Sequence, residues 1–156
     1  MADFYTVQGA LQNTEQDAKR ASGELLHGRS RIATTQYVTD GTEVNGDLIY
    51  IAKFDHPVLI DPTQSSVAVS ATLDGSAVTM DIGDDPGWTH ITPDVDRYAD
   101  GITVTSAGII PYGAAGVAVS APYTTTEGGW LVATIIASSA LNASITLTFR
   151  TNYSIN

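Results

Sequence analysis

The side chains best suited to chemistry lie between Gly83 and Gly101. Carboxylates dominate this segment, and their oxygens are the ligands that Ca²⁺ prefers in proteins. Their spacing does not match the EF-hand calcium loop, which carries a glutamate at its twelfth position. We therefore predict no metal site and no cofactor. The five carboxylates are Asp84, Asp85, Asp94, Asp96 and Asp100.

A structural role explains the same carboxylates more simply. Arg97 is one of three bases among residues 32–156, and a carboxylate is a strong hydrogen-bond partner for a guanidinium group. We predict that Asp84 or Asp96 pairs with Arg97, while Tyr98 packs inward and holds the loop. A glycosidic cleft is an alternative, in which two carboxylates flank a sugar and Trp88 and Tyr98 stack on it.

Other catalytic arrangements find little support in the sequence. His27, His56 and His90 lie in three different contexts, none with a short metal-binding spacing. The chain has no Gly-x-Ser-x-Gly motif, and the absence of cysteine excludes a thiolate nucleophile and a thiolate metal site. We expect a protein that is not an enzyme.

The charges are divided unevenly along the chain. Residues 1–31 hold four acids and four bases, whereas residues 32–156 hold 13 acids and three bases and so carry the whole net charge of −10. Because affinity for nucleic acid comes mainly from Lys and Arg, nucleic acid is a poor partner for this body. A membrane-spanning helix needs about 20 predominantly apolar residues, and no window approaches that, so we expect no membrane partner.

The elements that position these side chains are predicted to be strands. Residues 32–38, 47–54, 130–137 and 143–150 are rich in β-branched residues, and 47–54 has apolar residues on both faces, which predicts a central strand. Turns are predicted at Asp40-Gly41, Asn45-Gly46 and Asp61-Pro62.

The clearest local pattern predicts a β-hairpin over residues 66–83. Two alternating runs flank Asp74-Gly75, a dipeptide typical of a type I′ turn, and the implied register sets Val69 opposite Met80 and Val67 opposite Ile82. Many short strands predict an all-β fold, a jelly-roll-like antiparallel β-sandwich over residues 32–156. Residues 1–31 are predicted to form an N-terminal arm, partly helical or extended.

Four short motifs resemble one family of viral proteins. They are LIYIAK at 48–53, DIGD at 81–84, DRYADG at 96–101 and ITLTF at 145–149. Over residues 45–151 the chain resembles the small proteins encoded beside the major capsid gene in tailed bacteriophages, known as capsid decoration, cement or head-stabilising proteins. The resemblance omits the arm.

The resemblance implies a virion structural protein. Such a body would sit on the outer capsid surface, contact the major capsid protein, bridge its subunits and often form a homo-oligomer, with a trimer favoured. The arm would then bind the capsid through its bases: Lys19, Arg20, Arg29 and Arg31.

An alternative is a receptor- or carbohydrate-binding β-sandwich of a phage fibre or adhesin. Its stacking platforms would come from four aromatic residues: Trp88, Tyr98, Tyr112 and Trp130.

Overall fold

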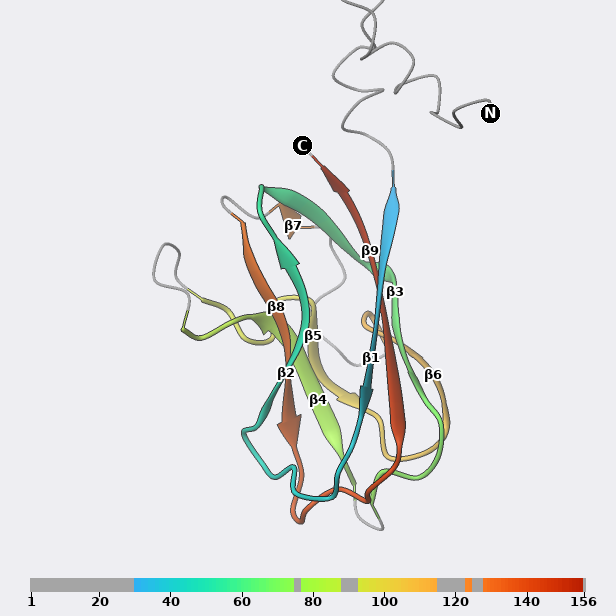
Figure 1. The fold of residues 1–156 in the computed structure, drawn as a ribbon. Helices are drawn as coiled ribbons and strands as arrows, with labels where there is room; N and C mark the ends of the chain where they lie inside the picture. Colours follow the sequence, from blue (N-terminus) through green and yellow to red (C-terminus); the bar gives the residue numbers. More distant parts are fainter. Residues whose placement is uncertain (1–29, 75–76, 88–92, 115–122, 125–127, 156) are drawn as a thin grey trace, which may run out of the picture.

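A computed structural model describes residues 30–74, 77–87, 93–114, 123–124 and 128–155 and shows two antiparallel β-sheets packed face to face (Figure 1). No helix occurs in these ranges. The strands are β1 (Arg31–Val38), β2 (Leu48–Phe54), β3 (Val58–Val69), β4 (Thr79–Asp84), β5 (Ala99–Thr103), β6 (Gly108–Pro111), β7 (Tyr123–Thr124), β8 (Gly129–Ile136) and β9 (Thr146–Ile155).

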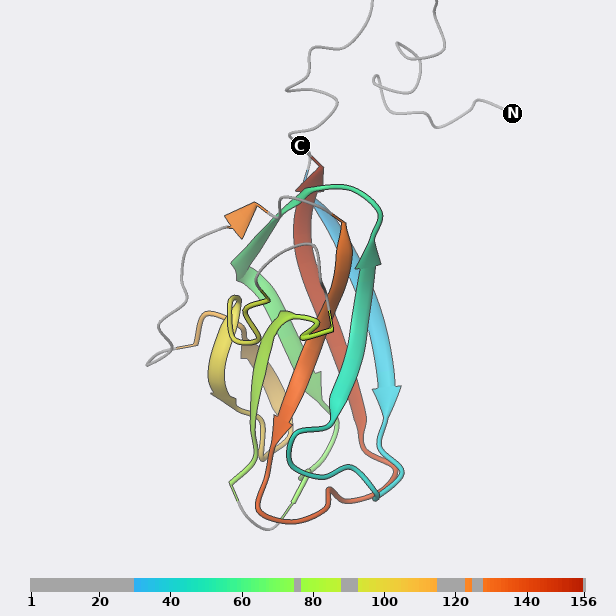
Figure 2. The ribbon, with the colours of Figure 1, turned by 90° about the vertical axis from the view of Figure 1, so that its left-hand side faces the viewer.

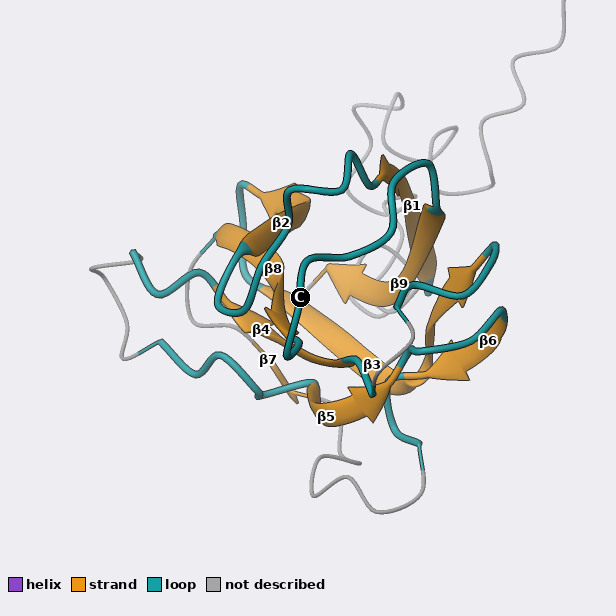
Figure 3. Cartoon of the chain, turned by 90° about the horizontal axis from the view of Figure 1, so that it is seen from below, coloured by secondary structure: helices purple, strands orange, loops and turns teal. Residues whose placement is uncertain are grey.

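The strand pairing is that of a long antiparallel ribbon rolled into a sandwich. Four antiparallel strand pairs, each enclosing the one before it in sequence, form the ribbon: β4 with β5, β3 with β6, β2 with β8 and β1 with β9. Rolling the ribbon up brings two further pairs together, β3 with β9 and β4 with β8. One sheet then has the order β1-β9-β3-β6, with β7 also on β3, and the other has the order β2-β8-β4-β5 (Figures 1 and 3). This is jelly-roll topology, and the predicted antiparallel β-sandwich is confirmed.

The core forms where the alternating apolar faces of the two sheets meet. Val67 and Phe149 lie opposite each other in the five-stranded sheet, and Met80 and Ile135 do so in the four-stranded sheet. All four are completely buried. Burying a side chain of this size contributes about 1.5–3 kcal/mol to the stability of the fold. The strands therefore form a stable framework that positions the loops between them.

The predicted hairpin at residues 66–83 is wrong. β3 ends at Val69, β4 begins at Thr79, and the two strands belong to different sheets. The connection crosses between the sheets, where Leu73 N donates to Thr105 O at 2.9 Å and Val78 N donates to Thr105 Oγ1 at 2.8 Å. The alternating pattern correctly identified the buried face of each strand. The two strands, however, face each other across the core from opposite sheets and are not neighbours in one sheet.

The central position predicted for residues 47–54 and the turn predicted at Asp61-Pro62 are also wrong. β2 is an edge strand that pairs only with β8 among the described strands, and Tyr50 on it is 49% exposed. The residues at Asp61-Pro62 do not end a strand. They form a bulge inside β3, where Asp61 Oδ1 accepts a hydrogen bond from Thr63 N at 2.9 Å and the pairing with β9 resumes at Ser66.

Candidate functional site

In the loop that joins β4 to β5, residues 93–98 fold back over the outer side of β4 at Gly83 (Figure 2). Asp84 N donates to Asp94 O and Tyr98 N donates to Ile82 O, each at 2.8 Å. Gly83 permits this path, because a Cβ there would lie 2.2 Å from the carbonyl oxygen of Asp94. A side chain at this position would therefore displace the loop.

Arg97 fastens the loop to the end of β4. Its Nε donates to Asp84 Oδ2 at 2.8 Å, and the same carboxylate oxygen accepts from Asp94 N at 3.2 Å. Burial raises the pKa of Asp84, while Arg97 opposes that rise through its hydrogen bond and charge. Of the two carboxylates suggested by the sequence, Asp84 is the one paired with Arg97.

Asp96 instead interacts with another carboxyl group. A side-chain hydrogen bond with Asp94 raises the pKa of Asp96 to about 6, with smaller contributions from burial and the negative charge of Asp94. In the described part of the chain, no three His, Cys, Asp or Glu side chains gather as a metal site would require. The described part of the loop therefore offers a carboxyl pair and two ion pairs, those of Arg97 with Asp84 at 2.8 Å and with Asp94 at 3.8 Å.

The proposed sugar-stacking residues are mostly inaccessible. Tyr98 and Tyr112 are completely buried, and the Tyr112 hydroxyl lies 3.2 Å from Thr151 Oγ1. Burial raises the pKa of Tyr112 well above its ordinary value. Trp88 lies outside the described residues, so Trp130, 38% exposed, is the described candidate that can stack on a ligand.

An exposed aromatic pair on the four-stranded sheet was not predicted. The rings of Tyr50 and Trp130 pack edge to face with centroids 5.2 Å apart, and Lys53 Nζ lies 6.0 Å from the Trp130 ring centre. The pairing of β2 with β8 brings them together. An alternating sequence predicts each side chain's face, but not which distant strand lies beside it.

The outer surface of the five-stranded sheet is organised as two rows of side chains. One row runs Gln36–Thr148–Ala68–Ile109 across β1, β9, β3 and β6, and the next runs Thr34–Arg150–Ser66–Pro111. We call these eight residues the carboxylate-free face. Ala68 and Ser66 are small and lie between longer side chains, which leaves a hollow of about 250 Å³. The hollow is lined by Gln36, Ser66, Ala68, Ile109, Thr148 and Arg150.

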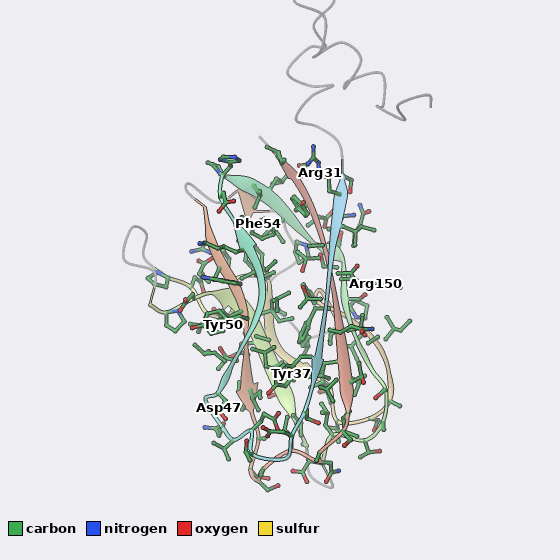
Figure 4. The ribbon with its side chains drawn as sticks, in the orientation of Figure 1. Arg31, Tyr37, Asp47, Tyr50, Phe54 and Arg150 are labelled. Atoms are coloured by element: carbon green, nitrogen blue, oxygen red, sulfur yellow. The ribbon has the colours of Figure 1, made fainter. Side chains whose placement is uncertain are left out.

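Most of the predicted capsid-binding arm lies outside the described residues, including Lys19, Arg20 and Arg29. Arg31 is described: it is exposed, begins β1 and lies opposite Tyr153 of β9 (Figure 4). The chain therefore enters the body at an edge of the five-stranded sheet. No described helix has the length and hydropathy to cross a membrane.

Comparison with known proteins finds similarity in structure alone. No family model matches, and no curated protein matches the sequence. Three chains of solved structures match. One is in the capsid asymmetric unit of cyanophage Pam1, with 13% identity, a TM-score of 0.56, and 82% of this chain and 86% of that chain covered. Another is in the acid-stable capsid of Helicobacter pylori bacteriophage KHP30, with 13% identity, a TM-score of 0.52, and 83% and 90% covered. At this identity the likeness concerns the fold.

Proposed function

We propose that this protein is a virion structural protein that decorates an icosahedral phage capsid and cements it by bridging subunits of the major capsid protein. The observation that carries the proposal is the near-complete structural alignment with chains of two phage capsids. Because the alignments cover 86% and 90% of those chains, each neighbour is itself a polypeptide of about this size. This supports a separate small component of the shell.

The arrangement of the acidic side chains favours a structural role over catalysis. Asp84 is committed to Arg97, and Glu43 accepts hydrogen bonds from the Tyr37 hydroxyl at 2.7 Å and from Asp40 N at 2.9 Å. Both carboxylates hold loops at the ends of strands. Rigid loops on a sandwich suit a body that acts through its surfaces.

The stabilising mechanism is multivalency. Many modest contacts repeated around a shell increase the work needed to separate its subunits, and a trimer on a local threefold position would engage several subunits together. The arm bases Lys19, Arg20, Arg29 and Arg31 would add contacts beside β1. Native mass measurement tests the trimer.

Co-sedimentation with shells assembled from the major capsid protein of the same phage tests the function. The wild-type chain should co-sediment to saturation. Replacing the four arm bases with alanine should weaken binding and leave the thermal unfolding of the body unchanged. Failure of the wild type to bind would overturn the proposal. Unchanged binding by the four-alanine variant would show that the arm bases do not contribute to capsid binding.

The exposed Tyr50–Trp130 pair favours carbohydrate binding as a second candidate. Its edge-to-face geometry, with 76° between the ring planes, gives one stacking ring instead of a flat two-ring platform. A glycan array tests it: binding that Trp130→Ala abolishes would support this candidate, and no binding to any glycan would reject it.

A further inference from the structure

We infer that the carboxylate-free face is the surface that docks on the shell, and that its hollow receives a carboxylate side chain of the shell protein against Arg150. The inference rests on the proposed function and names the surface through which the protein would bind the shell. Three observations support it: the distribution of acidic residues over the two sheets, the environment of Arg150, and the position of Ser30–Arg31 at the start of β1.

The two sheets differ in charge. The strands of the four-stranded sheet carry Asp81 and Asp100 in addition to Asp84, which is buried and paired with Arg97, and the described part of the β4–β5 loop adds Asp85, Asp94 and Asp96. In the described strands of the five-stranded sheet, the one acid is Asp61. Asp61 lies opposite Asn152, outside the two rows, and its carboxylate accepts hydrogen bonds from Thr63 and Gln64.

Such a division is unexpected for a surface that only faces water. Carboxylates keep an acidic protein soluble, and a sheet face without them lacks that protection. The face instead carries small hydroxyl and methyl groups with Ile109 standing out, 72% exposed. A surface of this composition is suited to burial against another protein, since Arg150 is the one charged side chain in its two rows.

The positive charge of Arg150 indicates that the partner group is negatively charged. Arg150 projects from β9 beside the hollow (Figure 4) and forms no ion pair with any described residue. A carboxylate that enters the hollow would form charge-assisted hydrogen bonds with the guanidinium group. The hydroxyls of Ser66 and Thr148 line the same hollow and could bond the remaining lone pairs.

The shell fits this face better than a second copy does. A twofold contact of the face with itself would bring two Arg150 side chains together with no carboxylate in the rows to neutralise them. The chain also enters the body at Ser30, directly before β1, which is the edge strand of this sheet. The basic arm and the face are thus joined, and docking here points the acidic sheet away from the shell.

Two variants of the full-length chain test the inference against a matched control. Arg150→Glu reverses the charge in the hollow, and Ala68→Tyr fills the hollow while keeping a good strand former at an outward position. Lys53→Glu makes the same charge reversal at an exposed position of β2, in the other sheet. Circular dichroism and thermal unfolding establish that each variant is folded.

Binding to shells of the major capsid protein is then measured by co-sedimentation. Arg150→Glu and Ala68→Tyr should each weaken binding at least about tenfold, with Lys53→Glu binding like the wild type. Wild-type-like binding by both test variants, or an equal loss in Lys53→Glu, would overturn the inference while the proposed function stands. If the wild type does not bind, the proposed function itself fails. If Ala68→Tyr abolishes self-association in light scattering and leaves shell binding intact, the face joins copies and the inference is also overturned.

Discussion

Arg97 Nε and Asp84 Oδ2 lie 2.8 Å apart, and their side chains are 16% and 3% exposed. The pair joins the last residue of β4 to the far part of the β4–β5 loop. A carboxylate buried this deeply is costly without a cation beside it. The ion pair therefore holds the second half of this loop, residues 93–98, against the end of β4.

Arg97→Ala should destabilise the protein by about 2 kcal/mol at pH 7, because it leaves the Asp84 carboxylate buried without its cation. Burial already raises the pKa of Asp84, and the variant should raise it further. The loss should therefore shrink as the pH falls and Asp84 becomes protonated. Urea unfolding checks this, with Arg150→Ala, an exposed arginine, expected to stay within about 0.5 kcal/mol of wild type. A loss independent of pH would contradict the explanation.

Gly83→Ala should cost about 2 kcal/mol or more, because the added Cβ meets the backbone of Asp94 and Val95 at 2.2–2.5 Å. Backbone atoms this close must move, and the loop should leave its position against β4. Gly87→Ala is the control, since its Cβ would first meet the flexible Asp85 side chain at 3.3 Å. Thermal unfolding that ranks the two variants equally would count against the packing argument.

Glu43→Gln should destabilise the protein by about 1 kcal/mol at neutral pH. Burial alone would raise the pKa of Glu43, but hydrogen bonds from Tyr37 and two backbone amides lower it below its ordinary 4.5. A lowered pKa means that the ionised group stabilises the fold above its ordinary pKa and loses that effect as the pH falls through the lowered value. Unfolding curves of the variant and wild type should converge in acid. The control is Asp55→Asn, a change at an exposed carboxylate, which should unfold like the wild type.

Asp94→Asn should return the pKa of Asp96 from about 6 toward its ordinary 3.8. A raised carboxyl pKa favours the folded state below the ordinary value and loses that effect as the pH rises through about 6. The stability of the variant relative to wild type should therefore increase as the pH rises from 3.8 to about 6, and the gain should remain above that pH. NMR titration of the Asp96 carboxyl measures the shift, and Asp85→Asn in the same loop should leave it unchanged. An Asp96 midpoint unaffected by Asp94→Asn would refute the pairing.

Sequence patterns predicted the buried faces well and the strand neighbours poorly. The alternation of Val67 and Val69, and of Met80 and Ile82, identified core residues correctly. It could not distinguish two paired strands from two strands that face each other across the core. Pairing is decided by β9 and β8, more than 50 residues away in sequence, where Phe149 and Ile135 lie opposite Val67 and Met80.

The candidate surfaces show the same limit. The local partner of Arg97 was within reach of the sequence, because Asp84 and Arg97 bracket a single loop. The hollow was not, since each of its rows takes residues from four strands spread between Thr34 and Arg150. Its floor depends on Ala68 and Ser66 being small, which acquires meaning only when their neighbours are known.

The central claim is that this chain binds an assembled phage capsid and stabilises it. The most direct measurement starts from capsids that lack the protein and adds purified protein to them at increasing concentrations. Light scattering then records the temperature at which the capsids in each sample break open. The disruption temperature should rise and level off at a fixed number of copies per capsid, as expected for a repeated, saturable site. A disruption temperature that stays constant at all protein concentrations would contradict the claim.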